Sequence, residues 1–68
     1  MNIGDIVIVV NTESIPVTFL GLYGRIIDVH EYKVTVEIYH SVNGLGGLSH
    51  TAFESDLKKI GETTVDLD

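Results

Sequence analysis

The sequence predicts a small all-β domain with five short strands, and two features of its composition support that prediction. Eight Ile, nine Val and six Thr supply β-branched side chains in a chain of 68 residues that has a single Ala. These side chains are restricted at χ1 and fit a strand better than a helix. Glycines separate the short runs of these residues, as expected where strands are joined by turns. Helix is therefore expected at most as a single turn.

The length and composition also limit what the protein can do. A chain of 68 residues forms one domain, and it buries only roughly 60 % of the surface that its unfolded form exposes. There is no room for a deep cofactor cleft, so a large enzyme is excluded and no cofactor is expected. Because the chain has no Cys, neither a disulfide nor a Cys-based metal cluster can add stability.

The first strand is expected at residues 6–10, all of which are Ile or Val. Such a run does not alternate, so both of its faces should be at least partly covered. A long irregular loop is expected at residues 11–21, because Pro16 lacks an amide donor and favours an extended conformation at Ile15. The apolar side chains of this loop should close one end of the core. They are Ile15, Val17, Phe19 and Leu20.

The second strand, at residues 25–30, is expected to contain an irregularity. Ile26 and Val29 lie three positions apart, whereas the side chains of a regular strand return to the same face every second residue. Keeping both side chains inward requires one extra residue, so the spacing predicts a bulge or sharp coil near Ile27 and Asp28.

A tight turn at Glu31 and Tyr32 should lead into the third strand, at residues 33–40. This strand shows the clearest alternation in the chain, which predicts one buried and one solvated face. The inward residues are Val34, Val36 and Ile38, and the outward residues are Thr35, Glu37 and Tyr39.

The remaining elements are short. Residues 41–50 contain three glycines and display Leu45 and Leu48. A fourth strand is expected at residues 51–53, followed by a single helical turn at residues 54–57 that Ser55 or Asp56 is free to cap. A closing strand at residues 58–60 completes the domain, which is expected to span residues 1–60. Residues 61–68 are expected to form a flexible acidic tail.

Four groups of residues follow a pattern along the chain. They are Gly4-Asp5-Ile6-Val7-Ile8-Val9, Gly21-x-x-Gly24-Arg25-Ile26 with Val29, Val34-x-Val36-x-Ile38, and Phe53 with Asp56-Leu57-Lys58-Lys59-Ile60. Together they resemble the pattern of KOW-type and related small SH3-like barrels, a family that includes the small accessory subunit of photosystem I and the variable chain of ferredoxin–thioredoxin reductase. The resemblance covers roughly residues 3–60 and implies a five-stranded SH3-like barrel with a long first loop and a single turn before the last strand.

Within this family pattern, two pairs of residues have expected structural roles. Gly21 and Gly24 bracket the entry to the second strand, where the backbone turns sharply and a Cβ would clash. Phe53 and Leu57 are expected to seal the lower end of the barrel.

Charge and exposed aromatic residues favour protein binding over other functions. The formal net charge is −6, so the molecule repels nucleic-acid phosphates over long range. Exposed tyrosines favour protein interfaces in an acidic chain, and acidic residues would steer it toward a basic partner. We therefore expect a protein-interaction module or small accessory subunit, and the sequence leaves a homo-oligomer open. The expected partner-binding residues are Tyr32, Tyr39, Leu45, Leu48, Glu31 and Glu37.

Two other functions remain as alternatives. A KOW-like nucleic-acid-binding module would need its four bases on one face, and they are Arg25, Lys33, Lys58 and Lys59. An acidic inhibitor from a phage or mobile element would occupy a basic nucleic-acid-binding groove, and its acids would share a face. Those acids are Glu31, Glu37, Glu54 and the acids of the tail.

The sequence predicts neither a catalytic nor a metal site. His30, His40 and His50 lie ten residues apart, whereas ligand pairs in zinc sites lie two to five apart. No serine stands in a nucleophile elbow, so a non-enzymatic protein is expected. Residues 1–10 are too short to span a bilayer and lack a basic leader and a cleavage site. A cytoplasmic protein without a membrane partner is therefore expected.

Overall fold

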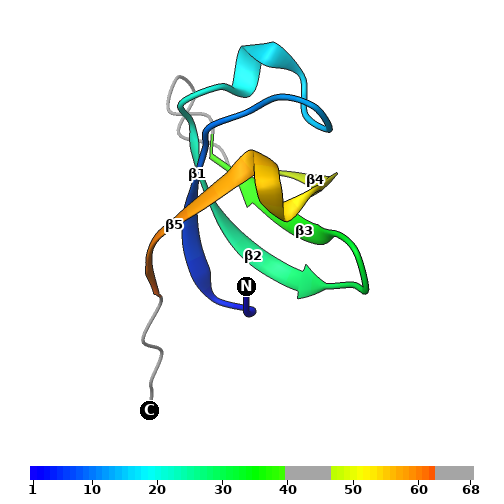
Figure 1. Ribbon diagram of the computed structural model, residues 1–68. Helices are drawn as coiled ribbons and strands as arrows, with labels where there is room; N and C mark the ends of the chain where they lie inside the picture. Colours follow the sequence, from blue (N-terminus) through cyan, green and yellow to red (C-terminus); the bar gives the residue numbers. More distant parts are fainter. Residues whose placement is uncertain (40–46, 63–68) are drawn as a thin grey trace.

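The computed structural model describes residues 1–39 and 47–62, and within them it confirms an all-β fold. Five antiparallel strands form one sheet, and the only helical elements of this part of the chain are two single turns of 3-10 helix (Figure 1). The strands are β1 (Asp5–Val9), β2 (Tyr23–Val29), β3 (Val34–Ile38), β4 (Leu48–Ala52) and β5 (Leu57–Glu62), and the turns are η1 (Val17–Phe19) and η2 (Glu54–Asp56).

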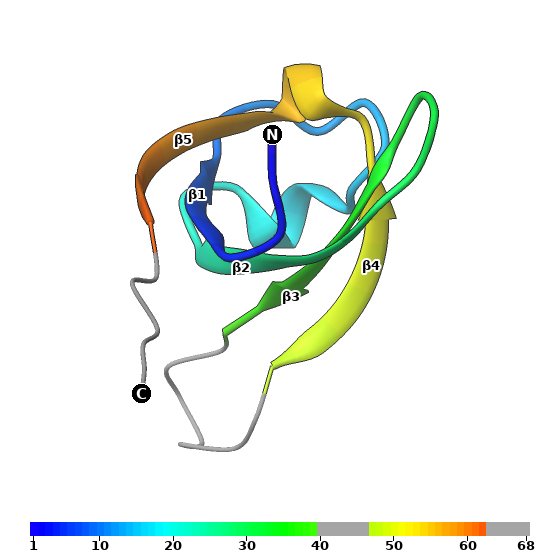
Figure 2. The same cartoon turned by 90° about the horizontal axis from the view of Figure 1, so that it is seen from below.

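The order of the strands across the sheet is β4-β3-β2-β1-β5. Consecutive strands pair from β1 to β4, and the last strand, β5, returns to pair with the free side of β1. The sheet curls around a common interior, as the view along it in Figure 2 shows. The turn η2 connects the two edge strands, β4 and β5, which are not paired with each other in the described residues.

The core consists of the inward-facing residues of the sheet together with two residues of the long loop. Along β1, Val7 and Val9 are buried while Ile6 and Ile8 are half-buried, so both faces of this strand are partly covered, as predicted. The buried apolar residues are Val7, Val9, Ile15, Phe19, Ile26, Val34, Val36, Ile38, Ala52 and Leu57. Burial of this β-branched cluster is the main favourable contribution to folding.

The predicted irregularity in β2 is confirmed, because the register with β3 shifts between Ile26 and Asp28. The prediction that the bulge would bury Val29 is wrong, since 40 % of this residue remains exposed. Val29 pairs with the buried Val34 and therefore shares its face, but it stands next to the turn, at the end of the sheet where fewer residues cover it. The tight turn itself is confirmed, and there the His30 N–H donates to the Lys33 carbonyl at 2.8 Å.

The alternation predicted for β3 is also confirmed. Its three inward residues have no exposed surface, whereas Thr35 and Glu37 are half-buried on the other face. The strand is central in the sheet, with β2 on one side and β4 on the other. It therefore positions the residues of both of its neighbours.

The long loop covers one end of the core, but with only half of its predicted apolar residues. Ile15 and Phe19 are buried, whereas Val17 is 69 % exposed and Leu20 is 53 % exposed. The reason is η1, which lies inside the loop. A single turn with about three residues per turn directs Phe19 inward and leaves its apolar neighbours on the solvent side.

The pair of residues predicted to seal the lower end of the barrel does not do so. Leu57 is buried, but Phe53 is 39 % exposed, so the predicted pair does not seal this end. Phe53 stands in the connection between β4 and η2, and the Lys33 ammonium group lies 6.0 Å from the centre of its ring. Neither Ser55 nor Asp56 caps η2 through its side chain. The Asp56 carboxylate instead accepts hydrogen bonds from Ser14 in the long loop.

Strands β4 and β5 are longer than predicted, because pairing to a neighbouring strand extends them into residues without a strand pattern. β4 begins at Leu48, and β5 runs from Leu57 to Glu62 with a register shift against β1 between Ile6 and Val7. Gly61 and Glu62 therefore belong to the sheet. The predicted site residue Leu45, together with His40 and residues 63–68, lies outside the described residues.

Candidate functional site

The outer face of the sheet carries two adjacent tyrosines, Tyr23 on β2 and Tyr39 directly after β3. The backbone N–H of Tyr39 donates to the carbonyl of Tyr23 at 2.9 Å, one position beyond the pair formed by Gly24 and Ile38. Gly24 and Ile38 are buried, so alternation places both tyrosines on the opposite, outer face. Tyr23 is 55 % exposed and Tyr39 is 39 % exposed. Two adjacent aromatic side chains are thus available on the surface.

A polar network holds Tyr39 in place. Its hydroxyl donates to Glu37 Oε1 at 3.1 Å, and Arg25 Nη2 lies 3.5 Å from the same oxygen. Burial of the ring, followed by the hydrogen bond to Glu37, raises the pKa of the Tyr39 phenol. Tyr39 is therefore a neutral phenol whose only hydroxyl proton is directed at the Glu37 carboxylate.

The two tyrosines continue a row of side chains that begins on β5 and β1. Tyr23 on β2 pairs with Ile8 on β1, and Ile8 pairs with Lys58 on β5. Because directly paired residues share a face, these residues form one outer row that consists of Lys58, Ile8, Tyr23 and Tyr39. The row combines an aliphatic side chain, two aromatic rings and one ammonium group, a combination that suits contact with another protein.

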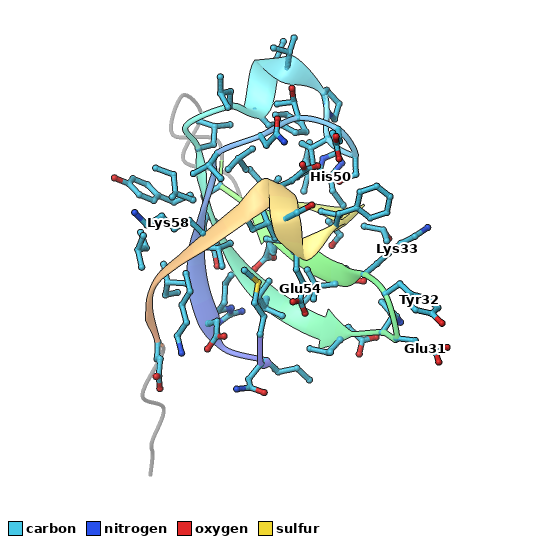
Figure 3. The ribbon with its side chains drawn as sticks, viewed as in Figure 1. Glu31, Tyr32, Lys33, His50, Glu54 and Lys58 are labelled. Carbon is cyan, nitrogen blue, oxygen red and sulfur yellow. The ribbon has the colours of Figure 1, made fainter. Side chains whose placement is uncertain are left out.

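The structure does not gather the predicted partner-binding residues into one surface. Tyr32 is 79 % exposed and stands with Glu31 at the turn between β2 and β3, which Figure 3 shows projecting from the molecule. Tyr39 and Glu37 lie toward the other end of β3. An extended chain rises about 3.3 Å per residue, so Tyr32 and Tyr39 are separated by roughly 20 Å.

Of the two apolar residues predicted for the same surface, Leu45 lies outside the described residues and Leu48 is not beside Tyr39. Leu48 is 55 % exposed, but it pairs with Ile38, so its side chain lies on the inward face of the sheet. The outer row instead contains Ile8 and Tyr23, which the sequence prediction did not include. The alternation of side chains along β2 could have placed Tyr23 on the outer face, because it is two residues before Arg25 and one residue before the inward-facing Gly24.

The four bases required for nucleic-acid binding are dispersed or engaged. Figure 3 shows Lys58 and Lys33 projecting from opposite sides of the molecule. Arg25 lies beside Glu37, and Lys59 Nζ is 3.4 Å from Asp5 and 3.0 Å from Glu62. The four bases therefore do not form one basic patch.

The acids are likewise divided among separate contacts. Glu54 of η2 lies 3.5 Å from the amino group of Met1, while Glu37 is engaged by Arg25 and Tyr39. Asp5 is buried, and the backbone N–H of Asn2 and the ammonium group of Lys59 hold its pKa below the usual range. Asp5 and its partners thus connect the start of the chain to β5 and serve the fold.

The histidines of the described residues lie in different environments. His30 Nε2 is 2.9 Å from the Thr35 hydroxyl and 3.7 Å from an Asp28 oxygen on the surface. The His50 ring packs edge-on against Phe19 with 4.6 Å between the ring centres. Within residues 1–39 and 47–62 no group of three or more His, Asp or Glu side chains could hold a metal ion. In the same ranges, no helix has the length and apolar character needed to cross a membrane.

Comparisons of this chain with protein-family models, with curated proteins and with solved structures found no match.

Proposed function

We propose that this chain is a non-catalytic protein-binding module with an SH3-like barrel fold. Three features support the fold: the strand order β4-β3-β2-β1-β5, the long loop between β1 and β2, and the single turn η2 directly before β5. The bulge in β2 and the curled sheet agree with the same architecture (Figure 2). Small barrels of this kind are suited to binding through an outer face that is held in place by a rigid sheet.

The observation that carries the proposed function is the outer row. Its tyrosines are side chains with few rotatable bonds that supply large contact areas, and such residues dominate the energetics of protein interfaces. A backbone hydrogen bond joins the two residues at the end of the β2–β3 pairing, so their relative position is fixed before a partner arrives. The row also contains Lys58 at its edge, which gives the interface a polar rim.

The charge distribution favours a partner with a basic surface. The chain has a net charge of −6. Two of the four bases, Arg25 and Lys59, already lie beside acids of the chain itself. The exposed acids Glu13 and Glu31 have no ion-pair partner among the described residues. Long-range attraction would increase the rate of association with a basic protein, while the outer row would determine the affinity.

The proposal is tested by substituting the two tyrosines one at a time. The partner is first identified by photo-crosslinking in native cells from a benzophenone amino acid placed at position 58, at the end of the row. We then expect Tyr23→Ala and Tyr39→Ala to weaken binding of that partner by about tenfold or more. Calorimetry with the purified partner measures the effect. The control is Val17→Ala, which truncates an exposed apolar residue of η1 and should leave the affinity unchanged.

Three results would contradict the proposed function. The first is unchanged affinity in both tyrosine variants. The second is loss of affinity in Tyr32→Ala alone, which would place the interface at the turn between β2 and β3. The third is binding of RNA or DNA at about 150 mM salt, which would favour the nucleic-acid alternative in spite of the dispersed bases.

A further inference from the structure

The edge strand β4 presents one side without a neighbouring strand. It pairs with β3 alone, and its other side ends the sheet in the described residues. Figure 2 shows the strand along one margin of the molecule. An unpaired edge exposes backbone donors and acceptors that can bind another strand.

The register identifies which backbone groups of β4 are free. The Tyr39 N–H donates to β2, so alternate residues of β3 direct their backbone groups toward β2, and the residues between them direct theirs toward β4. The latter residues are Val34, Val36 and Ile38, which pair with Ala52, His50 and Leu48. The remaining residues of β4, Ser49 and Thr51, therefore direct their N–H and carbonyl groups away from the sheet. Both residues are exposed.

The two edges of the sheet differ in their protection. The opposite edge, β5, contains Lys58, Lys59 and Glu62, and its register is irregular. Charged side chains and bulges are devices that prevent edge strands from pairing with other chains. The sequence of β4, LSHTA, contains no charged residue and no proline. This edge therefore lacks the protection that the other one has.

We infer that β4 pairs antiparallel with β4 of a second copy of this chain, about a two-fold axis at His50. In this register, Ser49 lies opposite Thr51 of the second copy, and each pair exchanges two backbone hydrogen bonds. The free groups of Ser49 and Thr51 are symmetric about His50, so one strand satisfies the other completely. The result is a continuous sheet of ten strands across two copies of a five-stranded sheet.

The side chains of β4 are compatible with this pairing. Ser49 and Thr51 carry hydroxyl groups that can bond across the strands. Leu48 is 55 % exposed, whereas Ala52 is fully buried in its own chain, so the pairing rests on the backbone groups of Ser49 and Thr51. His50 stands at the two-fold axis, and its ring packs edge-on against Phe19 of its own chain with 4.6 Å between the ring centres.

The charge of the chain favours pairing through β4 over other contacts between two copies. The net charge of −6 opposes close approach of two molecules at most surfaces. Pairing through β4 places no charged residues directly opposite each other, since the strand has none. A contact limited to five-residue strands is small, so the dimer is expected to be weak and to form in the range of about 10 µM to 1 mM.

The experiment is sedimentation of the full chain over that concentration range, combined with amide hydrogen exchange. We expect the sedimentation coefficient to rise with concentration while exchange at Ser49 and Thr51 slows in parallel. Thr51→Pro removes a donor that is directed away from β3, so it keeps the internal pairing and should reduce dimer affinity roughly tenfold or more. Thr51→Lys should act in the same way through charge, whereas Ser55→Lys, with the same charge change in η2, should not.

Each other outcome would overturn the inference. A chain that remains monomeric at the highest concentration has no such dimer. A dimer that persists in both Thr51 variants uses another surface, such as the outer row. Protection of Ser49 and Thr51 that does not depend on concentration would mean that the edge is covered within one chain. Circular dichroism of each variant verifies that the fold is retained.

Discussion

Replacement of Asp56 by alanine is expected to lower the melting temperature of the domain by roughly 10 °C or more. The Asp56 carboxylate is fully buried, and its Oδ2 accepts hydrogen bonds from the backbone N–H of Ser14 at 2.6 Å and from the Ser14 hydroxyl. Alanine cannot accept either bond. The N–H of Ser14 would then be left without its acceptor, which costs more than the bond contributes when it is made.

The network around Asp56 explains why the effect should be large. The Ser14 hydroxyl, which donates to Asp56, also accepts from the backbone N–H of Phe53 at 2.9 Å. The carbonyl of Asp56 accepts from Val10 and Asn11. Asp56 thus attaches residues 10, 11 and 14 of the long loop to the turn η2. The buried Ile15 follows directly after them in the sequence.

Two further variants distinguish the network from a general effect of substitution. Ser14→Ala keeps the bond from the Ser14 N–H to the carboxylate and should lower the melting temperature by a smaller amount. Glu54→Ala removes a half-exposed carboxylate from the same turn and should have little effect. Calorimetry measures all three. Equal melting temperatures for Asp56→Ala and Glu54→Ala would show that the buried network does not stabilise the fold.

The same carboxylate makes the stability depend on pH. The Ser14 hydroxyl, together with the backbone N–H groups of Ser14 and Glu13, lowers the pKa of Asp56 from its ordinary value of 3.8 against the opposing effect of burial. A group whose pKa is lower in the folded state contributes stability that is present above its unfolded pKa and is lost as the pH falls through its folded pKa. The difference in melting temperature between the wild type and Asp56→Ala should therefore shrink as the pH is lowered below about 4.

Local patterns in the sequence were sufficient to predict much of the fold. The alternation in β3 reports directly on burial, since every second side chain faces the core. The three-residue spacing of Ile26 and Val29 predicted the bulge from the same rule. The role of Asp56 could not be predicted in this way, because its partner Ser14 is 42 residues distant in sequence. At the sequence level, Asp56 has the features of a helix cap.

The candidate site was harder to predict than the fold, because it depends on register between strands. Tyr39 was placed on the outer face from its own strand, but Tyr23 becomes its neighbour only through the pairing of β2 with β3. The sequence pattern predicts that Tyr32 is exposed as well, yet Tyr32 lies in the turn at the other end of β3. β4 was missed in part because its polar residues have no strand pattern, and its pairing with β3 alone defines it.

Replacement of Gly24 by alanine is expected to lower the free energy of unfolding by about 2–3 kcal/mol. A Cβ at this position would lie 2.7 Å from Val36 Cγ2 and 2.8 Å from the backbone oxygen of Glu37. Both contacts are shorter than van der Waals separation, and the second involves backbone that cannot rotate away. To accommodate the methyl group, β2 and β3 would have to move apart between the residues that hold Tyr23 beside Tyr39.

The control for this prediction is Gly21→Ala, because the other glycine at the entry to β2 is required for a different reason. Gly21 has a φ of +86° and no atom within 4 Å of its missing Cβ, so alanine there should cost only about 1 kcal/mol of backbone strain. Urea denaturation of Gly24→Ala, Val36→Ala and the double variant would then separate the two contacts of Gly24. In the Val36→Ala background, Gly24→Ala should lower the free energy of unfolding by less than it does in the wild type. The loss that remains in this background measures the contact with the Glu37 carbonyl. Equal losses for Gly21→Ala and Gly24→Ala would mean that close approach of β2 and β3 is not what requires Gly24.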